Sequence, residues 1–192
     1  MKTPVRLLLT LCLTAFLVAC ASSPSGGLGQ LPSSKHTDLE NLLLQASKRS
    51  GSQAVGLNLA AADLAWQQQQ ALRAREILEA IDFAEATPAQ LIFAKTLEAE
   101  LAVFRNQAKA ALTILQHPSL SHLAQMPIEQ QTRTQLVRAQ ALQDTGKPLA
   151  AARERIFIAP LLEGQQAFAN HQTIWQLLSD LPRNQLQDSG EA

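Results

Sequence analysis

The sequence predicts an all-α protein in which tetratricopeptide-like helix pairs stack into a short right-handed solenoid. Three observations support this prediction. Leu, Ala and Gln, which favour helices, supply 33, 31 and 22 of the 192 residues. Apolar residues recur every three or four positions, as they do on one face of a helix. A pattern of helix, short polar turn and helix occurs three times without gaps.

The chain begins with the pattern of a bacterial signal peptide. Lys2 and Arg6 precede an uncharged apolar run at residues 7–19. These 13 residues would cover about 20 Å as a helix, which is shorter than the roughly 30 Å hydrocarbon layer of a membrane. We therefore expect residues 1–19 to be a cleaved signal peptide and not a membrane span.

The apolar run ends in a sequence that looks like a lipobox. Leu17, Val18 and Ala19 stand directly before Cys20, which is the expected site of lipidation by palmitate and other acyl chains. The alternative is an ordinary signal peptide followed by a chance cysteine. Several acyl chains would anchor the protein almost irreversibly, because each buried CH₂ contributes about 0.8 kcal/mol. Since Ala21 and not Asp follows Cys20, similarity to sorted lipoproteins favours the periplasmic side of the outer membrane.

Residues 20–36 have the composition of a flexible tether. Ten of these 17 residues are Gly, Ser or Pro, which bury little surface. The mean reach of such a tether is about 20 to 25 Å. The chain has 16 Lys+Arg and 16 Asp+Glu, and loss of Lys2 and Arg6 with the signal peptide leaves a net side-chain charge of −2. This balance argues against nucleic-acid binding.

The helical domain is expected at residues 37–182. Two apolar stripes open it, and a capping signal, Thr87 before Pro88, predicts the start of a later helix. Pro127 and Pro148 are likewise expected near first turns. The two stripes consist of Leu39, Leu42, Leu43 and Ala46, and of Leu57, Ala60, Ala61, Leu64 and Ala65.

Three stretches of this domain superpose as repeats, at spacings of 37 and 41 residues. Their polar turns lie at residues 67–70, 105–107 and 145–147. Small alanines at matching positions would let the second helix pack closely on the first. An irregular helical bundle is the alternative. The matched sets are Leu64, Leu101 and Leu142, then Ala71, Ala108 and Leu149, then Ala74, Ala111 and Ala152, and last Leu78, Leu115 and Ile156.

A final helix pair is expected at residues 148–161 and 165–181, followed by a disordered tail at residues 183–192. Trp175, Leu177, Leu178 and Leu181 should close the core there. The other large aromatic residues, Trp66, Phe93 and Phe104, are also expected in the core.

No motif of catalysis or metal binding is visible in the sequence. The four histidines, His36, His117, His122 and His171, lack partners at a useful spacing. Glu98 and Glu100 point to different faces of a helix, and a solvated surface explains Glu76 and Glu79. A serine nucleophile elbow, a phosphate loop and a zinc-protease helix are all absent. We therefore expect no enzyme activity, no cofactor, no metal and no small-molecule substrate.

One stretch carries a family resemblance. Residues 158–164, Ile-Ala-Pro-Leu-Leu-Glu-Gly, are followed at residues 173–178 by Thr-Ile-Trp-Gln-Leu-Leu. Together with the lipobox and the paired helices, they resemble the amino-terminal domain of the penicillin-binding protein activators, a family of outer-membrane lipoproteins. The resemblance covers about residues 38–187.

This resemblance implies a regulator of peptidoglycan synthesis that binds and activates a bifunctional class A penicillin-binding protein of the 1A type. The helical domain would be a spacer and docking element. Family members continue into a two-lobed α/β domain, so the chain is expected to be either a truncated or a short form. The resemblance identifies no partner-binding residue.

Two other interpretations remain open. The chain could be a general tetratricopeptide-like lipoprotein scaffold for envelope assembly, serving pilus secretins or outer-membrane proteins. It could also be a fragment of a lytic transglycosylase, although the Glu-Ser pair of those enzymes does not occur in the sequence.

Overall fold

The computed structural model describes residues 38–179 and 181–182, which form helices and no strand. This confirms the predicted all-α class. The predicted signal peptide with its lipobox, the tether and the tail lie outside the described residues. In chain order the elements are α1 (Leu39–Ser47), α2 (Gly51–Gln67), α3 (Ala71–Glu79), α4 (Pro88–Phe104), α5 (Ala108–Ile114), the 3-10 segment η2 (Pro118–Gln125), α6 (Ile128–Asp144), α7 (Pro148–Ile158), the 3-10 turn η3 (Ala159–Leu161) and α8 (Gly164–Ser179).

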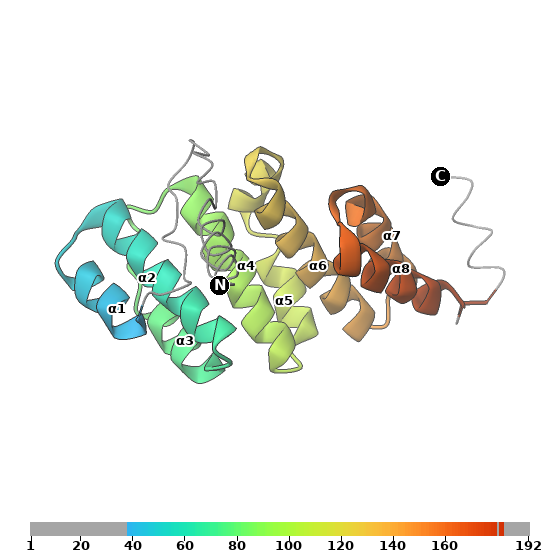
Figure 1. Cartoon of the computed structure of the whole chain (residues 1–192), viewed down its shortest axis with the longest axis horizontal. Coiled ribbons are helices and arrows are strands. Elements are labelled where there is room, and N and C mark those ends of the chain that lie inside the picture. The colour runs from blue at the N-terminus through green and yellow to red at the C-terminus, as the bar shows by residue number, and fades with distance from the viewer. Residues whose placement is uncertain (1–37, 180, 183–192) are drawn as a thin grey trace, which may run out of the picture.

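The helices follow one another along the long axis of the molecule, from α1 at one end to α8 at the other (Figure 1). Three pairs, α2 with α3, α4 with α5 and α6 with α7, form the body. The first helix of each pair contacts the first helix of the next pair, so α2 contacts α4 and α4 contacts α6. The second helices also contribute, because α3 packs on α4 and α5 packs on α6. The predicted stacking of helix pairs is therefore present.

The turns inside the three pairs share one backbone geometry. Each contains a residue in the left-handed region, and the residue after it donates its N–H to a carbonyl of the preceding helix. The left-handed residues are Gln69, Asn106 and Gly146, with φ of 62°, 59° and 74°. The hydrogen bonds run from Gln70 to Ala65, from Gln107 to Ala102 and from Lys147 to Leu142.

These turns correct the predicted register of the third repeat by one residue. Ala141, and not Leu142, is the counterpart of Leu64 and Leu101, because each of the three lies six residues before the turn's last residue. In the same way, fully buried Ala151 replaces Ala152 as the counterpart of Ala74 and Ala111. The match of Ile156 to Leu78 and Leu115 is also wrong, since those two leucines are buried and Ile156 is 51% exposed.

Local signals in the sequence set several helix ends. Thr87 caps α4 as predicted: its hydroxyl accepts the N–H of Gln90, and the Gln90 side chain accepts the N–H of Thr87. Pro88 and Pro148 are the first residues of α4 and α7, and Pro127 stands just before α6. Pro160 lies in η3, where the chain leaves α7 and turns into α8.

The core consists of three apolar clusters along the row of helices and thins towards the carboxyl end. One apolar cluster joins α1 to α4, and a second joins α4, α5, η2 and α6. Both predicted opening stripes contribute to the first cluster. At α7 and α8 the buried cluster contains only Ala151, Ala152 and Leu177, with Leu142 and Leu178 packed against it.

Two aromatic residues predicted in the core are instead exposed. Trp175 is 75% exposed, because α8 packs on α7 and η3 and the tryptophan lies on another face of α8. Phe104, the last residue of α4, is also exposed and touches Trp66 edge to face, with ring centroids 5.4 Å apart. Trp66 and Phe93 pack against the core as predicted.

Among the residues that the structure describes, none of the helices has both the length and the apolar composition needed to span a membrane.

Candidate functional site

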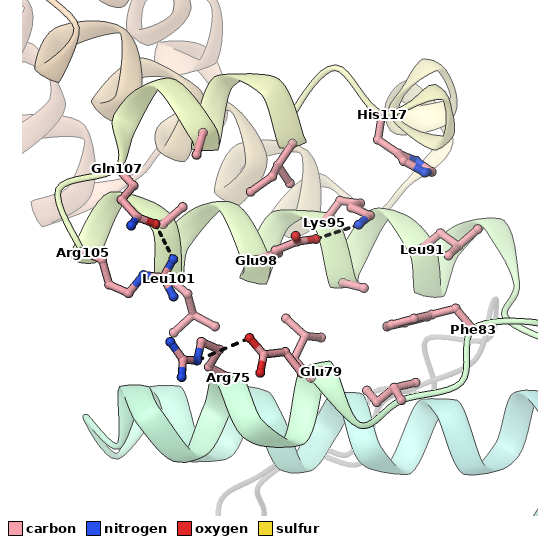
Figure 2. A pocket seen from close by; sticks show the side chains of 16 residues that line it. Arg75, Glu79, Phe83, Leu91, Lys95, Glu98, Leu101, Arg105, Gln107 and His117 are labelled. Carbon is pink, nitrogen blue, oxygen red and sulfur yellow. Dashed lines mark hydrogen bonds and ion pairs between the residues drawn. The ribbon is translucent and has the colours of Figure 1, made fainter.

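A groove of about 610 Å³ lies along α4, between α3 on one side and α5 on the other (Figure 2). Its floor comes from one face of α4, since Leu91, Lys95, Glu98 and Leu101 follow one another at helical spacing. Leu78 and Ile114 supply apolar walls from α3 and α5. The groove therefore combines apolar side chains from α3, α4 and α5 with charged side chains, two of which lie in its floor.

The charged side chains of the groove are mostly paired with one another. Lys95 Nζ lies 2.7 Å from the carboxylate of Glu98, and Arg75 Nε lies 3.4 Å from that of Glu79 (Figure 2). Arg105 donates to the side-chain oxygen of Gln107 and forms no ion pair with a carboxylate of the described residues. Arg105 can therefore pair with a carboxylate brought by a ligand.

A second charged cluster joins three consecutive first helices. Arg133 of α6 donates two hydrogen bonds to Glu100 of α4, from Nε at 2.7 Å and from Nη2 at 2.6 Å. The same Nη2 lies 2.6 Å from Asp63 of α2, and the guanidinium stands 5.1 Å from the ring centroid of Phe93. Burial alone would lower the pKa of Arg133, but the hydrogen bonds and charges of Glu100 and Asp63 outweigh it and raise that pKa. The cluster holds α2, α4 and α6 together.

A buried polar cluster lies between α4 and α6. The hydroxyls of Thr96 and Thr134 are 2.9 Å apart, and Gln130 donates to both. The two hydroxyls also bond to backbone carbonyls of their own helices. Since these groups satisfy one another inside the fold, their role is to align the two helices.

The histidines and acidic pairs singled out in the sequence do not form a catalytic group. His117 caps η2 by accepting the N–H of Ser119, His122 is exposed within η2, and His171 is exposed on α8. His36 lies outside the described residues. Glu98 and Glu100 bond to different partners, Lys95 and Arg133. Within residues 38–179 and 181–182, no cluster of three or more His, Cys, Asp or Glu side chains could hold a metal ion.

One known protein family matches most of the chain. The sequence pattern of the LppC putative lipoprotein family matches residues 32–192. The chain belongs to this LppC family. The family is named as one of lipoproteins, while Cys20 and the predicted lipobox stand outside the matched residues, so lipidation of Cys20 stays a prediction.

The chain is similar to a protein that is named as a penicillin-binding protein activator. It is 26% identical over 188 residues to the penicillin-binding protein activator LpoA of Photobacterium profundum, a match that spans 97% of this chain and 30% of that protein. The LppC chain thus spans under a third of the length of this relative. The sequence resemblance to activator amino-terminal domains is confirmed.

Solved structures share the fold of this LppC chain. The amino-terminal domain of E. coli LpoA superposes with a TM-score of 0.61 and 22% identity, over 78% of this chain and 65% of that domain. Full-length LpoA from Haemophilus influenzae gives a TM-score of 0.58 and 17% identity, over 80% of this chain and 28% of that one. These likenesses establish the helical fold.

Sequence reasoning missed both the groove and the Arg133 cluster of the LppC domain. A signal for part of the cluster existed, because Asp63 and Glu100 directly precede the matched Leu64 and Leu101. Two acids at the same repeat position indicate a shared cation. No spacing rule pointed to Arg133, which lies two turns earlier along its own helix than the matching position, residue 140.

Proposed function

We propose that this chain is the helical domain of an outer-membrane lipoprotein that binds and activates a bifunctional class A penicillin-binding protein of the 1A type. The observation that carries the proposal is the family match, together with the activator name of the relative from Photobacterium profundum. In this proposal the chain acts by binding and performs no catalysis itself.

The groove along α4 is the proposed docking site for the synthase. Its apolar side chains, including Leu78 and Leu101, suit a partner segment that also presents apolar side chains. Arg105, which no carboxylate among the described residues engages, would pair with an acidic group on that segment. Activation further requires that the bound protein prefers the active state of the synthase, because only differential affinity shifts a conformational equilibrium.

The anchoring of the domain is part of the same proposal. Cys20 would carry the lipid after cleavage of residues 1–19, and residues 20–36 would tether the helical domain, residues 37–182, on the periplasmic side of the outer membrane. The tether's mean reach of about 20 to 25 Å would let the groove stand clear of the lipid headgroups. Residues 183–192 would extend from the domain as a flexible tail.

The test measures both binding and activation. The chain from residue 20, carrying Cys20→Ser, is mixed with a purified class A synthase, and the peptidoglycan cross-linking rate is followed with and without it. We expect complex formation and a faster rate. The charge reversal Arg105→Glu should weaken binding at least tenfold, whereas Lys109→Glu, on the exposed face of α5 outside the groove, should leave it unchanged.

The possible results separate the proposal from its alternatives. If the chain neither binds a class A synthase nor changes its rate, the activator function is wrong for this chain. Copurification with envelope-assembly proteins and with no cell-wall enzyme would favour the general scaffold. Binding that is insensitive to Arg105→Glu would keep the function but exclude the groove as its site.

A further inference from the structure

The groove along α4 is not bridged from wall to wall. Its two ion pairs lie within α3 and within α4, so neither of them joins the α3 wall to the α5 wall. The next interval, between α5 and α7, is bridged by Arg138 of α6. Its Nη2 lies 3.4 Å from the carbonyl oxygen of Leu115, directly after α5, and its Nη1 lies 3.9 Å from the carboxylate of Glu154 on α7. The groove along α4 therefore keeps space for a ligand at a position that side chains close in the next interval.

One end of this groove carries a positive charge that the fold does not neutralise. The described residues that line the groove include three cations, Arg75, Lys95 and Arg105, and two carboxylates. Arg75 and Arg105 lie at the same end (Figure 2). Arg105 bonds to the neutral Gln107, and the Nε of Arg75 is buried without a hydrogen bond although Glu79 lies 3.4 Å away. A carboxylate of a ligand would find charge-assisted hydrogen bonds at this end.

The chemical character of the groove changes in order along α4. The distance from Arg105 along the helix axis is about 6 Å to Leu101, about 10 to 15 Å to the paired Lys95 and Glu98, and about 21 Å to Leu91. A ligand that follows the groove thus meets a cation, an apolar side chain, an ion pair and a second apolar side chain.

The far end of the groove, beyond the ion pair, also contains an aromatic ring. Phe83, from the segment between α3 and α4, lies there beside Leu91 (Figure 2). This end therefore suits a large apolar side chain.

The dimensions of the groove favour an extended segment over a helix. A volume of about 610 Å³ along about 21 Å gives a mean cross-section of about 30 Å². A helix with its side chains has a diameter of about 10 to 12 Å and a cross-section of about 80 to 110 Å², so about two thirds of it would stand outside the groove. An extended strand needs only about 50 Å², from its spacings of about 4.8 and 10 Å.

The side-chain spacing of an extended segment also matches the order of groups along α4. Alternate side chains point to the same side, and they recur about every 6.7 Å. Four such side chains in about seven residues stand at about 0, 7, 13 and 20 Å. These positions face Arg105, Leu101, the Lys95–Glu98 pair and Leu91 in turn. The matching inward side chains are an acid, an apolar residue, a polar residue and an apolar residue.

The predicted tether of the chain does not provide the required acid. Residues 20–37 contain Lys35 and no Asp or Glu. A carboxylate for the end at Arg75 and Arg105 therefore does not come from the tether.

We infer that the groove along α4 binds an extended, acidic segment of the synthase, in which an acid, an apolar, a polar and an apolar side chain alternate with outward-facing residues. The inference rests on the proposed function for the identity of the protein that brings the segment. The acid binds at Arg75 and Arg105, and the last apolar side chain binds at Phe83 and Leu91.

Fluorescence anisotropy with a short peptide tests this inference without the synthase. The probe is the labelled peptide Glu-Ser-Leu-Ser-Gln-Ser-Phe with blocked ends, together with the same residues in reverse order, because the groove specifies side chains and not the chain direction. We expect one of the two to bind the chain from residue 20, carrying Cys20→Ser, with a dissociation constant of about 100 µM. A hydrocarbon-stapled helix that displays the same four side chains should bind at least tenfold more weakly.

A charge swap tests the contact at Arg105. Arg105→Glu should weaken binding of the peptide at least tenfold, and replacing the Glu of the peptide with Lys should restore binding to this variant. Lys109→Glu, outside the groove on α5, is the matched control and should leave the affinity unchanged. Circular dichroism verifies that each variant is folded.

The results for the peptide and for the synthase are read separately. If neither peptide binds at about 2 mM, or if the stapled helix binds more tightly, the inference is overturned. Binding that Arg105→Glu leaves unchanged also overturns it. If the synthase binds the chain and the peptide neither binds nor displaces it, the activator function stands and this inference fails. If the peptide binds as expected and the synthase does not, the activator function fails and the ligand class of the groove stands.

Two other occupants of the groove would be recognised by the same experiment. If the peptide binds only after removal of residues 183–192, the acidic tail of the chain occupies the groove and the inference is overturned. If no peptide binds and the chain forms a dimer that Arg105→Glu abolishes, a second copy occupies the groove and the inference is again overturned.

Discussion

Replacing Arg133 with methionine should lower the free energy of unfolding by about 3 kcal/mol. The side chains of Asp63 and Glu100 are only 15% and 14% exposed, so loss of the guanidinium leaves two carboxylates partly buried and close together. Breaking a buried ion pair by removing one partner costs about 3 to 5 kcal/mol. The lower end applies here, because the side chain of Arg133 retains some access to water.

The neutral version of the cluster separates the charge effect from lost packing. In Arg133→Met combined with Asp63→Asn and Glu100→Gln, no unpaired charge remains. We expect this triple variant to recover to within about 1 kcal/mol of the parent, since neutral replacement of a buried ionic cluster is often tolerated. Arg133→Lys should give an intermediate loss, because lysine keeps the charge but not the planar bidentate geometry.

Urea unfolding followed by circular dichroism measures these differences. The loss in Arg133→Met corresponds to a fall in melting temperature of about 6 to 12 °C for a domain of this size. Because Arg133 joins α2, α4 and α6, its removal should also broaden the transition as the helix pairs unfold more independently. A loss below about 1 kcal/mol, or a triple variant no more stable than the single one, would refute this account of the cluster.

Three further predictions concern other parts of the chain. Thr87→Ala should destabilise the fold by about 1 kcal/mol in urea titrations through loss of the capping box, while Thr87→Ser should be near neutral. Burial raises the pKa of Glu154 despite the charge of Arg138. The stability that comes from the protonated carboxyl group is therefore present at low pH and is lost as the pH rises through that pKa. Glu154→Gln should melt at a higher temperature than the parent at pH 7 and show no advantage at about pH 3. Cys20→Ser should abolish incorporation of labelled palmitate and release the protein from outer-membrane fractions, and membrane retention of this variant would contradict the predicted anchor.

Sequence patterns predicted the structure correctly where the interactions that determine it are between residues close together in the chain. The Thr87 cap, the helix starts at Pro88 and Pro148 and the polar turns all involve residues within a few positions of one another. The predicted register of the third repeat was wrong for a related reason. Ala150, Ala151 and Ala152 are consecutive, so the sequence offers no way to decide which alanine faces the neighbouring helix. Only the turn at Gly146 settled it.

By itself, the sequence determined the helical class, the pairing of helices and the resemblance to a lipoprotein family. Periodicity, caps and motifs depend only on residues that are close together in the chain. The tertiary structure decided which distant side chains meet. Asp63, Glu100 and Arg133 come together only because three helices stack in one direction, and the groove exists only where α3, α4 and α5 converge. It also decided that Trp175 faces outward, since burial depends on what packs beside a helix and not on the helix's own pattern.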